Sequence, residues 1–102
     1  MTIVNPSKHE VIEILEKNRQ AIRRYGARSL GLFGSRARGE HTARSDLDFV
    51  VDLEVKSFDR YMDLKDFLER LFGCPVDLVL VDALKPRLRD AILREAVHAA
   101  GL

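Results

Sequence analysis

Apolar residues recur along this chain with two spacings, and each change of spacing marks the expected start or end of an element. Intervals of three and four residues predict helices, whereas short apolar or alternating runs predict strands. Helices are expected at residues 7–25, 57–72 and 84–99, with a short one at 35–38. Strands are expected at residues 29–33, 46–53 and 76–81. The order helix, strand, short helix, strand, helix, strand, helix therefore runs through the chain.

Capping residues support these boundaries. Ser7 and Glu10 have the separation of a capping box, and Gly26 stands where the first helix should stop. Ser57 can cap the second long helix, and Pro86 is tolerated in the first turn of the last one. The last helix would offer for burial Leu88, Ile92, Leu93, Ala96 and Ala99. The element order predicts an α+β fold, in which a small mixed β-sheet is backed by helices.

The composition agrees with one globular domain spanning residues 1–102. Hydrophobic residues make up 46% of the chain and charged residues 32%, which provides a core and excludes a disordered chain. The formal net charge of +1 indicates neither nucleic-acid binding nor membrane binding by the whole molecule. Cys74 is the only cysteine, which excludes an intrachain disulfide and a cysteine-rich zinc site. No segment has the length of a membrane span or the pattern of a leader, so a cytoplasmic protein is expected.

Candidate chemistry is concentrated between residues 34 and 52. Gly34 and Ser35 suit a turn whose backbone approaches a phosphate. Asp46 and Asp48 stand at positions i and i+2 of an expected strand, so their side chains share one face and lie roughly 6 to 7 Å apart at Cα. Two such carboxylates suit a divalent cation. Asp77, an acid inside an apolar run, is expected to be buried and to complete the site from a neighbouring strand.

Two common phosphate-binding motifs, Gly-x-Gly-x-x-Gly and Gly-x-x-x-x-Gly-Lys-Ser/Thr, are absent from the chain. The arrangement Gly34-Ser35, ten residues, Asp46-Leu47-Asp48 and a later Asp77 instead resembles the motif of polymerase-beta-type nucleotidyltransferases. The longer string from Leu32 to Gly39, with Ser45 to Phe49, is similar to the minimal nucleotidyltransferase (MNT) antitoxins that are encoded with HEPN toxins. The resemblance implies the nucleotidyltransferase fold.

For function, the resemblance implies an Mg²⁺-dependent protein adenylyltransferase that transfers AMP from ATP to a tyrosine of a partner HEPN ribonuclease toxin and so neutralises it. Asp46, Asp48 and Asp77 would be the catalytic residues and would bind Mg²⁺, with two ions expected. Asp77 would also accept the proton of the attacking hydroxyl. The residues expected to bind the nucleotide are Gly34, Ser35, Arg36 and Arg38, with Arg36 preferred over Arg38 for the departing pyrophosphate.

Several alternatives remain open at this point. The chain could neutralise its toxin by complex formation without catalysis, or it could modify a small molecule as aminoglycoside nucleotidyltransferases do. Arg38 could simply pair with a nearby acid on the surface. Asp52 is expected to have a structural role because it lies farther along the strand, and His41 is expected at the surface. The arginines near the first third of the chain, Arg19, Arg23, Arg24 and Arg28, are interpreted as solvated helix faces rather than a binding surface.

Overall fold

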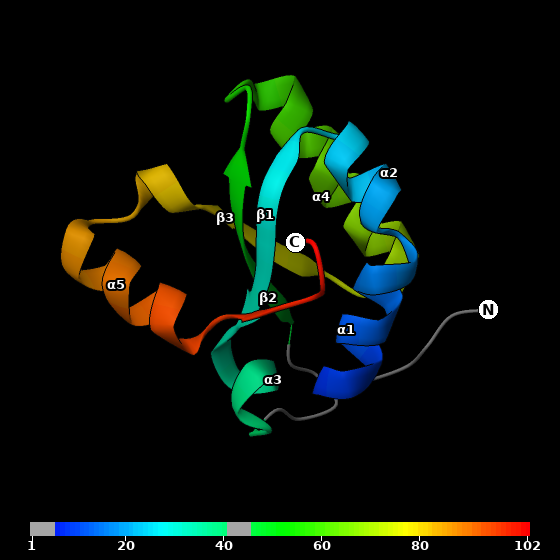
Figure 1. Ribbon diagram of the computed structural model, residues 1–102, viewed down its shortest axis with the longest axis vertical. Helices are drawn as coiled ribbons and strands as arrows, with labels where there is room; N and C mark the ends of the chain where they lie inside the picture. Colours follow the sequence, from blue (N-terminus) through cyan, green and yellow to red (C-terminus); the bar gives the residue numbers. More distant parts are fainter. Residues whose placement is uncertain (1–5, 41–45) are drawn as a thin grey trace.

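A four-stranded mixed sheet with the order β3-β2-β1-β4 forms the centre of the molecule (Figure 1). The computed structural model describes residues 6–40 and 46–102. β2 is parallel to β3, whereas β1 is antiparallel to both β2 and β4. The strands are β1 (Ala27–Phe33), β2 (Leu47–Leu53), β3 (Val76–Leu80) and β4 (Val97–His98). The helices are α1 (Lys8–Lys17), α2 (Arg19–Arg24), α3 (Gly34–Arg38), α4 (Phe58–Phe72), the 3₁₀ helix η1 (Val81–Ala83) and α5 (Pro86–Glu95). This architecture confirms the expected α+β class.

One face of the sheet carries the hydrophobic core, because α1, α2 and α4 pack against it while α5 lies on the other side (Figure 1). Alternation along β2 sends every second side chain into this core. The fully buried helix residues that meet the sheet are Val11, Leu15, Ile22, Leu64, Leu68 and Phe72. The rings of Phe49 and Phe72 lie 5.7 Å apart at their centroids. Strand β2 therefore packs most of its apolar side chains into this core, and Val50 is buried on the other face.

The first predicted helix is two helices, which corrects the sequence expectation of one helix over residues 7–25. Ser7 and Glu10 form the expected capping box, since each side chain accepts a hydrogen bond from the other residue's backbone amide. Asn18 then ends α1 and precedes α2, with its side-chain amide donating to the carbonyl of Ile14 at 2.9 Å. An asparagine that bonds to the backbone in this way competes with helix continuation.

The last predicted helix is shorter than expected. It ends at Glu95, after which Ala96 is extended and Val97–His98 pair with β1 as strand β4. Ile92 is buried as expected, but Leu88 and Leu93 are 51% and 42% exposed. Unpaired backbone groups along the edge of β1 compete for this segment, and a β-branched valine favours the strand. The expectation of helix through residue 99 was therefore wrong.

The remaining boundaries differ by one or two residues. β1 begins at Ala27 rather than Ser29, β2 begins one residue after Asp46, and β3 ends at Leu80. α4 begins after the capping hydroxyl of Ser57 as predicted. These offsets leave the expected order of elements intact.

Two of the arginines interpreted as solvated hold the C-terminal segment. Arg19 donates to the carbonyl of Ala100 at 2.9 Å, and Arg23 donates to the carbonyl of Gly101.

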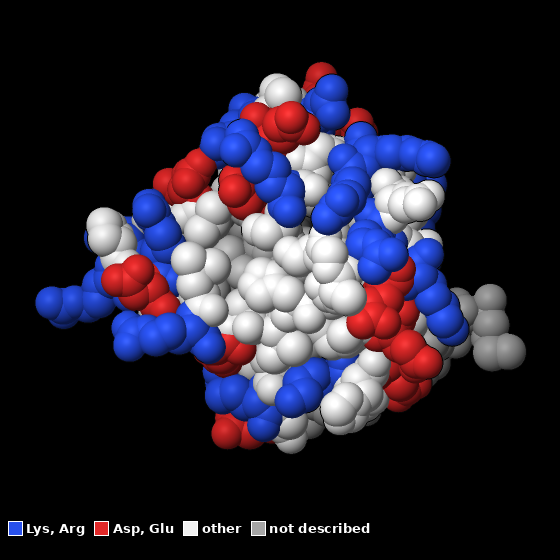
Figure 2. Space-filling model, viewed as in Figure 1, with Lys and Arg blue, Asp and Glu red and all other residues white. Residues whose placement is uncertain are grey.

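Figure 2 shows an uncharged area across the middle of this side of the molecule, with basic side chains gathered at the left over α5. No helix in residues 6–40 and 46–102 is both long and apolar enough to cross a membrane.

Candidate active site

Strand pairing brings the predicted site residues to one edge of the sheet. Phe33, the last residue of β1, pairs with Asp48, and Asp48 pairs with Asp77 of the parallel neighbour β3. Paired residues on adjacent strands lie about 5 Å apart and point to the same face. α3 begins with Gly34, directly after Phe33. The turn and two of the acids therefore meet although Gly34 and Asp77 lie 43 positions apart in the chain.

The two acids face away from the hydrophobic core. Leu47 and Phe49 are fully buried on the covered face, so the intervening Asp48 points to the other face, where it is half-buried. Asp46 is exposed just before β2 begins. Asp77 is also exposed, which corrects the expectation of a buried acid: β3 is an edge strand of the sheet in the described residues, and this face of it lacks the helices that cover the other.

The acids act on one another electrostatically. The pKa of the Asp48 carboxyl is raised above its usual value, chiefly because burial penalises its charge and then because Asp77 and Asp46 repel it. The nearby Arg38 opposes this shift. A carboxylate repelled by two others is stabilised by a bound cation, and oxygen donors are those that Mg²⁺ prefers. The donor set thus fits Mg²⁺.

The protein alone does not complete a metal site. Across the described parts of the chain, no three His, Cys, Asp or Glu side chains are grouped closely enough to hold an ion. Mg²⁺ commonly binds one or two protein carboxylates and completes its coordination with water and substrate phosphates, so a third protein ligand is not required. The number of ions stays a prediction.

Gly34 is packed against the central acid. Its φ of 77° lies in the left-handed region, and a Cβ built on it would lie 2.3 Å from Oδ2 of Asp48. Any other residue would be both strained and in collision with the carboxylate. Ser35 follows at the start of α3 and is half-buried. Glycine at this position therefore allows the backbone of the turn to lie directly beside Asp48.

The two arginines of α3 have opposite environments. Arg36 is 1% exposed, and its Nη1 donates to the carbonyl of Pro6 at 2.6 Å, so it connects α3 to the segment before α1. Arg38 is accessible: its Nε donates to Glu40 at 3.0 Å and its Nη1 donates to Glu95 at 2.5 Å, and these hydrogen bonds to the two acids raise the pKa of Arg38. The preference for Arg36 as the pyrophosphate-binding arginine is therefore revised in favour of Arg38.

A contact from α4 fixes the start of the strand that carries Asp77. The carboxylate of Glu69 accepts a hydrogen bond from the backbone amide of Val76 at 3.0 Å and one from Lys65 at 3.1 Å. The amide first, and the ammonium second, lower the pKa of Glu69. Since Val76 directly precedes Asp77, this contact holds the acid's backbone in place.

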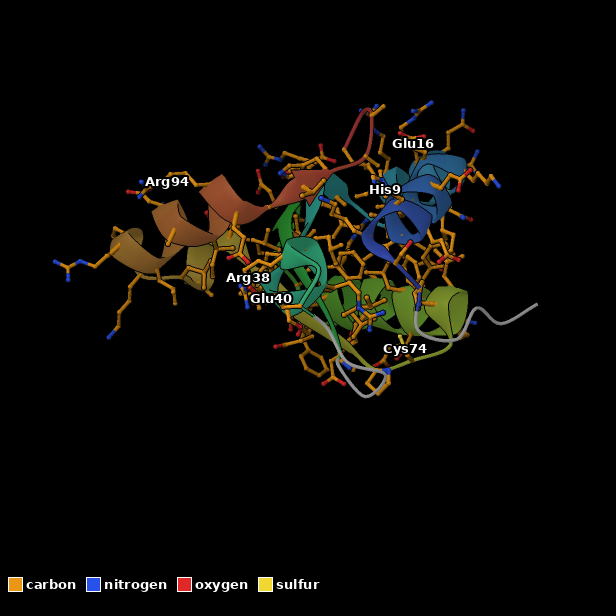
Figure 3. The ribbon with its side chains drawn as sticks, turned by 90° about the horizontal axis from the view of Figure 1, so that it is seen from below. His9, Glu16, Arg38, Glu40, Cys74 and Arg94 are labelled. Atoms are coloured by element: carbon orange, nitrogen blue, oxygen red, sulfur yellow. The ribbon has the colours of Figure 1, made fainter. Side chains whose placement is uncertain are left out.

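Glu95 is a site residue that the sequence interpretation missed. Figure 3 shows Arg38 and Glu40 together at the end of α3, next to the end of α5, where Glu95 lies. The sequence predicted a helix through residue 99, whereas the pairing of β4 with β1 after Glu95 is what brings this segment to the site. No local sequence signal marks that pairing.

The other sequence candidates lie outside this group. Asp52 pairs with Ser29 and lies four residues along β2 from Asp48. Burial raises the pKa of the Cys74 thiol, and its side chain lies apart from Arg38 and Glu40 in Figure 3. His41 falls outside the described residues.

Comparisons with known proteins agree with this geometry. Residues 9–98 match the nucleotidyltransferase domain family. The protein adenylyltransferase MntA of Thermococcus cleftensis is 40% identical over 91 residues, which cover 87% of this chain and 92% of that protein. A solved structure described as a minimal nucleotidyltransferase is 42% identical, has a TM-score of 0.72, and is matched over 84% of this chain and 93% of its own.

A more distant structure shares the fold. It is the tri-AMPylated HEPN toxin of Shewanella oneidensis in complex with its MNT antitoxin, which aligns with a TM-score of 0.61 at 18% identity, over 85% of this chain and 70% of that one. The resemblance deduced from residues 32–52 and Asp77 is confirmed by the family match and the 40% identical relative. The chain thus belongs to the nucleotidyltransferase domain family and is an enzyme of the minimal, AMP-transferring kind.

Proposed function

We propose that this protein uses Mg²⁺ and ATP to transfer AMP to a tyrosine hydroxyl of a partner HEPN-type toxin, and that the modification neutralises the toxin. The observation that carries the proposal is the register that sets Gly34 and Asp77 on either side of Asp48. The 40% identity to a protein named as a protein adenylyltransferase supports the reaction. The structural neighbour that contains an AMPylated HEPN toxin supports the type of acceptor.

Each site residue would bind either the metal ion or the phosphates of ATP. Asp46, Asp48 and Asp77 would supply the carboxylates that hold Mg²⁺ together with water and triphosphate oxygens, and the bound ion would offset the charge of the triphosphate and lower the pKa of the attacking hydroxyl. Gly34 lets the backbone approach the phosphates, and the amide and hydroxyl of Ser35 bind their oxygens. Arg38 offers its exposed guanidinium to the β- and γ-phosphates.

ATP and the tyrosine hydroxyl are the only reactants in the transfer step. The tyrosine oxygen forms a bond to the α-phosphorus of ATP, and the bond between that phosphorus and the bridging oxygen of the β-phosphate breaks. The electron pair leaves with pyrophosphate, and the hydroxyl proton passes to the carboxylate of Asp77. The exposure of Asp77 on an edge strand suits this role, because a partner's side chain can reach it directly.

The small size of the domain favours a protein acceptor. Two surface hollows are lined by other residues: one of about 330 Å³ by Asp90, Leu93 and Arg94, and one of about 210 Å³ by residues at the start of α4 with Leu80. Neither includes the acids Asp48 and Asp77. An acceptor that brings its own contact surface would suit exposed acids such as Asp46 and Asp77.

The test is neutralisation of the cognate HEPN toxin, with the mass of the purified toxin measured in parallel. Wild-type protein should rescue growth and add AMP to the toxin, whereas Asp48→Asn and Asp77→Asn should do neither. The variants should still bind the toxin in pull-down, which separates catalysis from assembly. Rescue by Asp48→Asn with unmodified toxin would instead establish the alternative in which complex formation alone neutralises the toxin.

A further inference from the structure

Glu95 brings a fourth carboxylate to the site, through an arginine rather than through the metal. It is the last residue of α5, it is 29% exposed at its side chain, and its Oε1 lies 2.5 Å from Nη1 of Arg38. The charges of both Glu95 and Arg38 act on Asp48. The three side chains therefore form one electrostatic group although they come from three elements.

The pairing of β4 with β1 sets the position of Glu95. Val97 pairs with Leu32 and His98 pairs with Gly31. Glu95 ends α5 two residues before β4 begins, so this pairing fixes the chain just after Glu95 beside the end of β1 that leads into Gly34. Gly31 permits the close fit, since a Cβ there would lie 2.7 Å from the His98 ring and 3.1 Å from the Ala96 methyl. Backbone pairing, rather than a mobile surface helix, thus holds the carboxylate at the turn.

Arg38 is held at two of its three nitrogens. Glu40 engages Nε and Glu95 engages Nη1, while within the described residues Nη2 makes no hydrogen bond. A guanidinium is a planar fork, so a partner in a set position at one nitrogen fixes the direction of the other nitrogens. Glu40 is only two residues from Arg38 and is 66% exposed, whereas Glu95 comes from a separate element with a set position. Glu95 is the contact that can orient the fork.

We propose that Glu95 is a positioning residue, which holds the guanidinium of Arg38 so that its Nη2 edge receives the β- and γ-phosphates of the nucleotide. This inference rests on the proposed nucleotidyl transfer. Removal of the Glu95 carboxylate should therefore change nucleotide affinity in the direction opposite to that expected from charge repulsion alone. A carboxylate near an anionic triphosphate repels it, so loss of the charge alone would strengthen nucleotide binding. Loss of the orientation would weaken it.

The experiment compares Glu95→Gln with the matched control Glu40→Gln, because each removes one carboxylate from Arg38. Both are titrated calorimetrically, with Mg²⁺ present, against α,β-methylene-ATP and against AMP, which lacks the β- and γ-phosphates. We expect Glu95→Gln to weaken binding of the ATP analogue about tenfold, as for loss of one well-aligned charged hydrogen bond, and to leave AMP unchanged. Glu40→Gln should change neither ligand by more than about twofold.

Glu95→Asp, which keeps the carboxylate on a shorter stem, should give an intermediate affinity, and it replaces Glu95→Gln if that variant does not fold. Tighter or unchanged binding of the ATP analogue by Glu95→Gln would overturn the positioning role. Equal weakening for the analogue and AMP would overturn it as well, since a general structural defect has no preference for the outer phosphates. If wild-type protein itself does not prefer the analogue to AMP, the proposed function fails instead.

Discussion

The two faces of strand β2 differ in what they demand of the residues on them. On the covered face, Leu47 and Phe49 are fully buried among helices, and any apolar side chain of suitable volume would serve there. On the other face, Asp48 is useful only because Phe33 leads into Gly34 on one side of it and Asp77 lies on the other. Stability resides mainly on one face and chemistry on the other, on alternate residues of the same strand.

The largest effect should come from the covered face. Phe49→Ala removes a ring that packs 5.7 Å from Phe72, and we expect it to lower the free energy of unfolding by about 3 to 5 kcal/mol. Urea denaturation followed by circular dichroism measures this loss. The adjacent substitution Asp48→Ala should cost no stability. If both variants lose stability equally, the separation of roles between the faces is wrong.

Gly34→Ala should have the next largest effect, because the new methyl would be strained at positive φ and would collide with Asp48. Gly39→Ala is its matched control: φ is 73° there as well, but among the described residues, chain neighbours aside, no atom lies within 4 Å of the added Cβ. We expect about 1 kcal/mol of backbone strain in both variants and a further loss of 1 to 2 kcal/mol in Gly34→Ala alone. Nucleotide binding should fail only in Gly34→Ala. Equal effects of the two substitutions would show that Gly34 serves the turn and not the acid.

Glu69→Ala removes the side chain through which α4, on the covered face of the sheet, holds the start of β3, the strand that carries Asp77. Loss of the hydrogen bond to Val76 should cost about 1 kcal/mol at neutral pH. Because the folded pKa of Glu69 is lowered, this contribution is complete above the unfolded value of about 4.3 and is lost as pH falls through the folded pKa. Thermal melts from pH 7 to pH 3 should therefore converge with wild type at the acid end. Asp66→Ala, an exposed acid on the same helix, should match wild type throughout.

The smallest effect has the opposite sign. Asp48→Asn removes a charge that burial and two neighbouring acids disfavour, so it should raise the melting temperature by about 1 to 3 °C at pH 7 while abolishing AMP transfer. The raised folded pKa means that the penalty of the charge is complete above that pKa and absent below the unfolded value of about 4. The gain should therefore vanish in acid. A lower melting temperature at pH 7 would show that the carboxylate stabilises the fold.

Local patterns were enough to predict the acids, the turn and most of the elements. The alternation in β2 and the spacing of Gly34 from the acids are properties of neighbouring residues, and the structure pairs Phe33 with Asp48 and places Gly34 against the Asp48 carboxylate. The burial of Arg36 depends instead on where the segment before α1 lies, and the contact of Arg38 with Glu95 depends on where α5 ends. No local pattern reports such a distant contact.

The same limit explains the errors at the two ends. The break at Asn18 results from a single side-chain hydrogen bond that competes with an otherwise continuous helical pattern. The helical spacing near the C-terminus was outweighed by pairing with the edge of β1, and this pairing is also what brings Glu95 to Arg38. The first error is thus a local side-chain contact that the apolar spacing does not report, and the second is a tertiary contact that prevailed over a local preference.

The most direct test of AMP transfer follows the two ends of ATP separately. Wild-type protein, Mg²⁺ and the cognate HEPN toxin are incubated with ATP radiolabelled at the α-phosphate or, in a parallel reaction, at the γ-phosphate. Nucleotidyl transfer at Asp46, Asp48 and Asp77 predicts that the toxin retains the α-label and that the γ-label appears in pyrophosphate, with Asp48→Asn giving neither. Retention of the γ-label on the toxin, or release of inorganic phosphate without any labelled toxin, would contradict it.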